Sequence, residues 1–192
     1  MLSVLLELQR LKRLDRTGWV LRGLPPGAES VAAHSYGVAL TAMLLADECA
    51  ARGVRVDVGR VVRIALLHDL QETRTGDMPR TVADYYGREA RRAAERAAFD
   101  DIMRGATQAS AYAELHEDYE SRASLEARLV KAADVIDLLA QALAFERAGS
   151  RGLDEFWEGA AERDFQLEGP AREVVAEAVA ALMREREVVS RQ

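Results

Sequence analysis

The chain has 192 residues, 49% of them hydrophobic, and its 26 Lys plus Arg against 32 Asp plus Glu give a net charge of −6. This composition is typical of a globular domain with a large core, and the acidic balance argues against nucleic-acid binding, which depends on basic patches that neutralise phosphates. Cys49 is the only cysteine in the sequence, so no intrachain disulfide is possible and a reducing, cytoplasmic location is expected.

The chain is predicted to be helical throughout. Gly and Pro clusters separate segments with helical periodicity, and they lie at 22–30, 52–54, 75–79 and 167–170. The first helical segment, 3–14, carries four charged residues, too many for a signal-peptide core or a membrane span. The next, 30–51, is apolar on nearly every side, as expected of a central helix surrounded by others.

Later segments show apolar residues at three- and four-residue spacing or a helix-start signal, and they cover 58–70, 88–103, 124–147 and 170–188. Asp57 can cap the first of these, and Pro170 suits the first turn of the last. No strand, internal repeat or long linker is predicted. We therefore expect an all-α fold in which residues 1–192 form a single-domain bundle of about six or seven helices.

A few polar residues interrupt the apolar faces of these helices, and they are His34, His68, Asp69, Glu72, Asp77 and Asp134. Each alone has an ordinary explanation: a histidine in an apolar helix is commonly a hydrogen-bonded core residue, and Asp134 can pair with Arg128 or Lys131. Taken together they indicate more, because an unpaired buried carboxylate is costly and a shared cation is a common remedy.

Two imidazoles and two carboxylates, from His34, His68, Asp69 and Asp134, form a mixed nitrogen and oxygen donor set. Such a set suits one divalent transition metal ion, such as Mn, Co, Ni, Zn or Fe. Magnesium fits less well because it prefers all-oxygen surroundings. Open coordination positions would let the ion generate hydroxide or polarise a phosphoryl oxygen.

The motifs "RTGWVLRG", "ESVAAHSYGVA", "LLHDLQETRTGDMP" and "EARLVKAADVIDLLAQALAFE" resemble those of the HD-domain superfamily of metal-dependent phosphohydrolases, in its HDDC2-like branch of 5′-deoxynucleotidases. The resemblance implies an HD-domain fold with a metal-binding core at 28–147, a substrate segment at 14–24 and a C-terminal helix at 170–188. It also implies a homodimer that hydrolyses deoxyribonucleoside 5′-monophosphates to deoxynucleosides and phosphate.

The resemblance assigns roles to individual residues. The implied metal ligands are His34, His68, Asp69 and Asp134. Glu72 and Asp77 match the carboxylates that the family uses near the attacking water and the leaving oxygen, and the resemblance leaves open which does which. Both carboxylates have plain alternatives, Glu72 as a solvated helix end and Asp77 as a turn residue.

The substrate segment contributes three further residues by resemblance. Arg16 matches an arginine directed at the phosphate, Trp19 a tryptophan associated with excluding a 2′-hydroxyl, and Arg22 is a second candidate for the phosphate. In the deoxynucleotidases the arginine and tryptophan are adjacent, whereas Thr17 and Gly18 separate them here. Ala33 also departs from the pattern, since relatives often have an acidic residue before the first metal ligand.

Three alternatives remain at the level of sequence. Binuclear HD phosphodiesterases need more histidines, and His116, in "AYAELHEDYE", is interpreted as a packing or surface residue rather than a ligand. Nucleotide triphosphohydrolases share the four-ligand core but are generally longer. A non-catalytic helical module that binds a metal or nucleotide would have no need of Glu72 and Asp77 beside open coordination positions.

Overall fold

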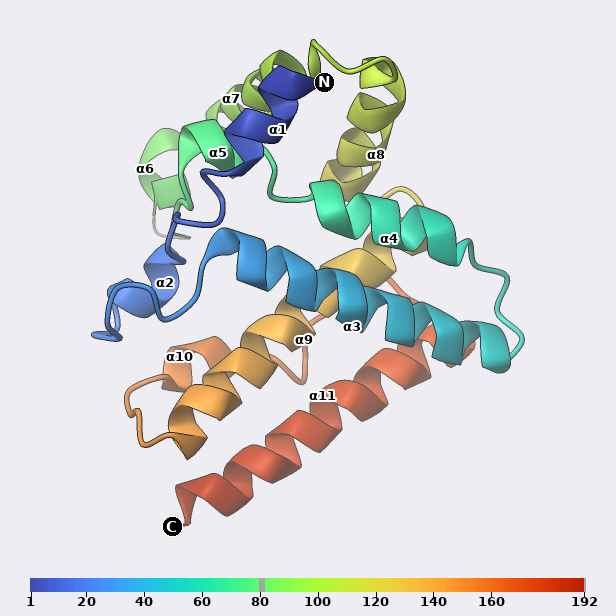
Figure 1. Ribbon diagram of the computed structural model, residues 1–192. Helices are drawn as coiled ribbons and strands as arrows, with labels where there is room; N and C mark the ends of the chain where they lie inside the picture. Colours follow the sequence, from blue (N-terminus) through green and yellow to red (C-terminus); the bar gives the residue numbers. More distant parts are fainter. Residues whose placement is uncertain (80–81, 192) are drawn as a thin grey trace. The chain divides into compact units, whose positions relative to one another are not determined.

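The structure is a computed structural model that describes residues 1–79 and 82–191 (Figure 1). The regular secondary structure of the described residues is helical, which confirms the all-α class, and Asp15 and Ser30 add an isolated bridge. The helices are α1 (Leu2–Leu8), α2 (Thr17–Val20), α3 (Val31–Ala51), α4 (Val58–Leu67), α5 (Glu72–Thr75), α6 (Ala83–Tyr86), α7 (Arg88–Met103), α8 (Ala109–Ser121), α9 (Leu125–Arg147), α10 (Asp154–Trp157) and α11 (Gly169–Ser190).

The chain divides into two compact units, each built from two stretches that are distant in sequence. The first unit comprises Met1–Tyr36 and Leu66–Glu117, and the second comprises Gly37–Ala65 and Asp118–Gln192. Within the range that the structure describes, no helix is long and apolar enough to cross a membrane.

In the first unit, α1 and α5 pack against α7 (Figure 1). A cluster of apolar side chains fills the space between them, and its buried members are Val4, Leu11, Val31, Leu70, Phe99, Ile102 and Met103. Burying a large apolar side chain contributes about 1.5–3 kcal/mol, so this cluster holds the start of α3 and the turn after α4 in one place. Both of those segments carry predicted site residues.

Two predicted helices end earlier than expected. The α-helix of the first segment ends at Leu8 rather than at residue 14, and residues 9–13 continue as turns. Helix α4 ends at Leu67 rather than at residue 70, because the N–H of Leu70 donates to the carbonyl of Leu67 at 3.1 Å. Bonds of this i to i−3 type tighten the backbone. His68 and Asp69 consequently lie in a turn rather than in the helix.

The other expectations about the helices had mixed outcomes. The predicted cap of α4 is confirmed, since Asp57 Oδ1 accepts the N–H of Arg60 at 3.0 Å. Helix α3 was expected to be surrounded by others, but Tyr36, Leu40 and Leu44, which recur along one face, are exposed. Helix α8 was not predicted.

The second unit contains the C-terminal helices. Helices α10 and α11 both pack against α9 (Figure 1). Ser124 caps α9, and its hydroxyl accepts the N–H of Ala127 at 3.1 Å. This cap fixes the start of the helix on which Asp134 lies.

Candidate active site

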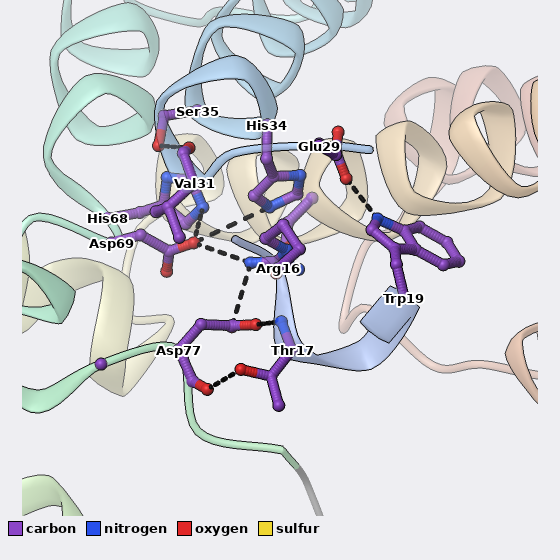
Figure 2. Close-up of polar contacts among 12 residues, drawn as sticks. Arg16, Thr17, Trp19, Glu29, Val31, His34, Ser35, His68, Asp69 and Asp77 are labelled. Atoms are coloured by element: carbon purple, nitrogen blue, oxygen red, sulfur yellow. Dashed lines mark hydrogen bonds and ion pairs between the residues drawn. The ribbon is translucent and has the colours of Figure 1, made fainter. Parts of the chain in front are cut away.

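Two buried histidines and an aspartate of the first unit converge in space. His34 lies in the first turn of α3 and His68 in the turn after α4, and both are almost fully buried. Asp69 Oδ2 lies 3.1 Å from His68 Nε2 and 3.8 Å from His34 Nε2 (Figure 2). Ring nitrogens of the two histidines lie within 4.8 Å of each other. The three side chains can therefore face one ion.

The surroundings of Asp69 favour its ionised form. Burial raises the pKa of this carboxyl, but the nearby His68 ring, the Arg16 guanidinium and His34 outweigh burial and hold the pKa well below its usual range. A carboxylate must be deprotonated to bind a metal ion. Two imidazoles beside an ionised carboxylate match the preference of divalent transition metals, so the donor chemistry fits the implied ion.

Arg16 links the substrate segment to this cluster. Its Nη1 lies 3.2 Å from Asp69 Oδ2 and 3.5 Å from Asp77 Oδ1 (Figure 2). Thr17 connects the same segment to Asp77 through two hydrogen bonds. The Thr17 N–H donates to the Asp77 carboxylate, and the Thr17 hydroxyl donates to the Asp77 carbonyl at 2.7 Å. The structure thus brings Arg16 and Asp77 together with the two histidines and Asp69.

The backbone before Asp77 requires a glycine. Gly76 ends α5 with a φ of 76°, a conformation that residues with a Cβ rarely adopt. This turn leads the chain out of α5 to the position where Asp77 contacts Thr17.

Glu72 and Arg22 are placed less specifically. Glu72 begins α5 and is 5% exposed, so it is not a solvated helix end. Its N–H donates to the Asp69 carbonyl at 3.1 Å, which keeps it within the turn that carries Asp69. Arg22 is half-buried, and its N–H donates to the Trp19 carbonyl at 3.0 Å. The roles of both side chains remain predictions.

Trp19 is a buried aromatic with a specific partner. Its side chain is 1% exposed, and its indole N–H donates to Glu29 Oε2 at 2.5 Å (Figure 2). Glu29 is also buried, and one of its carboxylate oxygens lies within 4.8 Å of a His34 ring nitrogen.

Glu29 was missed at the level of sequence because a glutamate in a Gly- and Pro-rich stretch is usually solvated. A signal was present in its position directly before Ser30, whose hydroxyl caps α3 by accepting the N–H of Ala33 at 3.1 Å. A residue beside a helix cap is fixed relative to the helix.

His116 packs inside the first unit, as one of the two interpretations of this residue predicted. It is 3% exposed, its ring stacks on Phe99 with centroids 4.2 Å apart, and its Nε2 lies 3.2 Å from Gln71 Oε1. Burial, reinforced by the charge of Arg96, lowers the pKa of His116 to about 4. The ring is therefore neutral at neutral pH.

Asp134 belongs to the second unit and has the ion pair that the sequence allowed. Lys131 Nζ donates to Asp134 Oδ2 at 2.7 Å, and the Tyr119 hydroxyl donates to the same oxygen at 3.0 Å. Arg128, the other predicted partner, instead donates to the backbone carbonyls of Arg122 and Ala123. The role of Asp134 as a metal ligand remains a prediction.

Comparison with known proteins identifies the family to which this chain belongs. The sequence matches the HD domain over residues 8–164. It is 33% identical to the 5′-deoxynucleotidase HDDC2 of Xenopus laevis, with 74% of this chain and 67% of that protein covered. It is 34% identical to the 5′-deoxynucleotidase YGK1 of Saccharomyces cerevisiae, with 81% of this chain and 72% of that protein covered.

A solved structure is also similar. A conserved hypothetical protein from Pyrococcus furiosus superimposes with a TM-score of 0.83 at 36% identity, with 96% of this chain and 99% of that chain covered. The extent of the domain match and the identity to these relatives show that the chain belongs to the HD-domain family of metal-dependent phosphohydrolases.

Proposed function

We propose that the protein is a metal-dependent 5′-deoxynucleotidase, which hydrolyses deoxyribonucleoside 5′-monophosphates to deoxynucleosides and phosphate. The observation that carries this proposal is the position of Arg16, whose guanidinium lies against Asp69 and Asp77 beside two buried histidines. An arginine at that position suits a phosphate bound next to a metal ion. The two similar proteins named above, which are 5′-deoxynucleotidases, support the same reaction.

In this proposal one divalent transition metal ion is held by His34, His68, Asp69 and Asp134. Mn, Co, Ni, Zn and Fe suit this set, and magnesium suits it less well. When bound, such an ion polarises a phosphoryl oxygen and lowers the pKa of water. The low pKa of Asp69 supports its assignment as a ligand.

The remaining residues bind the substrate and move protons. Arg16 makes two charge-assisted hydrogen bonds to the phosphate, and Thr17 keeps its backbone in place through Asp77. Glu72 and Asp77 share the proton transfers, one from the attacking water and one to the 5′-oxygen of the departing nucleoside as the P–O bond breaks.

The other predicted residues of the substrate segment, Trp19 and Arg22, provide sugar selectivity and an additional phosphate contact. Trp19 packs where the sugar binds and excludes a 2′-hydroxyl, and Arg22 gives the phosphate a further cationic contact. The hydrogen bond from the Trp19 indole to Glu29 supports this role, since a ring held in one orientation can reject an extra oxygen by steric contact.

We further propose that the protein works as a homodimer in the cytoplasm and binds no nucleic acid. The exposed apolar residues of α3, Tyr36, Leu40 and Leu44, support a subunit contact. The single, buried Cys49 suits a reducing compartment, and the net charge of −6 disfavours nucleic acid. Light scattering on the purified protein tests the dimer.

The test of the reaction is phosphate release from a panel of deoxyribonucleoside and ribonucleoside 5′-monophosphates, with each metal added to chelator-treated protein. Nucleoside triphosphates and cyclic dinucleotides serve as comparison substrates. We expect release from the deoxyribonucleoside monophosphates with transition metals. Failure to hydrolyse any monophosphate while metal is measurably bound would refute the proposal.

A further inference from the structure

Glu29 contacts two of the proposed substrate residues, Arg16 and Trp19, and lies beside a proposed metal ligand. Its backbone carbonyl accepts the N–H of Arg16 at 3.0 Å, and its carboxylate accepts the indole N–H of Trp19 at 2.5 Å. A carboxylate oxygen also lies within 4.8 Å of a His34 ring nitrogen. Figure 2 shows Glu29 with Trp19 on one side and His34 on the other.

The loop that carries Arg16 and Trp19 closes at Glu29. Asp15 and Ser30 form a backbone bridge where the loop begins and ends, and the N–H of Val31 donates to the carbonyl of Leu14 at 2.8 Å. Immediately afterwards Ser30 caps α3. The backbone of Glu29 is therefore fixed between the loop closure and the helix start.

The side-chain bond then fixes the Trp19 ring. An indole has one N–H donor and no acceptor, so its hydrogen bond to Glu29 selects one orientation of the ring. Trp19 is 1% exposed and Glu29 is 8% exposed, and a hydrogen bond is electrostatically stronger when it is shielded from water. An apolar side chain at position 29 would remove this acceptor while the indole stays buried.

We infer that Glu29 is a specificity-determining positioning residue: it holds the Trp19 indole in the orientation that discriminates 2′-deoxyribose from ribose. The inference rests on the proposed function and adds to it a residue that is assigned neither to the phosphate nor to the metal. Its distinguishing consequence is a change in the ratio between the two sugars, because loss of a merely structural residue would slow both reactions alike.

The test compares kcat/KM for a deoxyribonucleoside and a ribonucleoside monophosphate of the same base. Glu29→Leu should lower the deoxyribose-to-ribose ratio by about tenfold or more, the size expected when a buried donor loses its acceptor. Glu29→Gln keeps an acceptor oxygen and should stay within about threefold of the wild-type ratio. Trp19→Phe keeps an aromatic ring without the N–H and should resemble Glu29→Leu.

The double variant and a matched control sharpen the result. Because both changes break the same bond, Glu29→Leu combined with Trp19→Phe should lower the ratio no further than either single variant. Glu95 of the first unit is a comparably buried glutamate at 7% exposure, paired with Arg91 at 2.7 Å. Glu95→Leu should leave the ratio unchanged.

The metal content of Glu29→Leu should equal that of the wild type. The inference would be overturned by an unchanged sugar ratio in this variant, by an equal loss of activity on both sugars, or by a loss of bound metal. None of these outcomes would contradict the proposed phosphatase function of the wild type. A wild-type enzyme that does not distinguish the sugars would also overturn the inference. If Glu29→Leu does not fold, Trp19→Phe and Glu29→Gln carry the comparison.

Failure of the proposed function has a different outcome, in which the wild type hydrolyses no monophosphate. In that case the same variants are compared by calorimetric dissociation constants for the two monophosphates. A ribose-to-deoxyribose ratio of dissociation constants that Glu29→Leu lowers would still support the inference, and an unchanged ratio would overturn it.

Discussion

At the scale of single residues, Asp69 and Asp77 both contact Arg16. Substitution of each is expected to remove a different property of the enzyme. Asp69→Ala should lose bound metal and turnover together, because Asp69 lies 3.1 Å from the His68 ring. Asp77→Ala should keep its metal and lose turnover, by about 10²- to 10⁴-fold if only proton transfer is affected. Metal analysis and phosphate release on the same preparations measure both.

Asp77→Asn is the matched variant, because it keeps an oxygen that can accept the Thr17 N–H but loses the charge. It should also keep the metal and lose turnover. Full metal content in Asp69→Ala would show that this residue is not a ligand and that the assignment is wrong.

The lowered pKa of His116 predicts that the free energy of unfolding depends on pH in a specific way. Its pKa is lowered from 6.5 to about 4 in the folded chain by burial and by Arg96, so below pH 6.5 the unfolded chain binds a proton that the folded chain does not. The stability is therefore fully present above that pH and is lost as the pH falls toward 4. The difference corresponds to about 3 kcal/mol.

Urea unfolding of the metal-free protein at a series of pH values measures this effect. The variant His116→Phe, which keeps a stacking ring beside Phe99, should show a correspondingly smaller loss of unfolding free energy over the same range. Identical pH profiles for the two proteins would contradict the assignment.

At the scale of elements, the cap of α9 makes a separate prediction. The Ser124 hydroxyl accepts the N–H of Ala127 and donates to Asp118 Oδ2 at 2.7 Å. Ser124→Ala should lower the free energy of unfolding by about 1 kcal/mol, as for other helix caps. Ser190→Ala, at the exposed end of α11, is the control and should change it by less than about 0.5 kcal/mol. Equal effects would contradict the capping role.

The elements that the sequence predicted well are those with both periodicity and an end signal. Helix α7 has the predicted bounds, and α11 starts beside Pro170 as expected. Helix α8 was missed because its Tyr, His and acidic residues give it little amphipathic pattern. Helix α4 was predicted too long because "LLHDL" continues the helical pattern, whereas local i to i−3 bonds end the helix at Leu67.

For the chain as a whole, the resemblance of its motifs to a known family predicted the residues that converge in the first unit. Arg16, His34, Asp69 and Asp77 were all expected near one another, and the structure brings them together, while their roles remain predictions. Glu29 was not expected. Glu29 is the first residue of the motif "ESVAAHSYGVA", but its contacts form where the loop closes on itself, and no periodic pattern predicts that closure.

The most direct test of the central claim is phosphate release from a deoxyribonucleoside 5′-monophosphate, measured as metal is titrated into chelator-treated protein. If the protein is a mononuclear phosphohydrolase, it should release no phosphate without metal. Phosphate release should then rise with added metal and saturate at about one transition metal ion per chain. No release at any metal loading, with binding confirmed on the same samples, would contradict the claim, and saturation only at two ions per chain would contradict the mononuclear site.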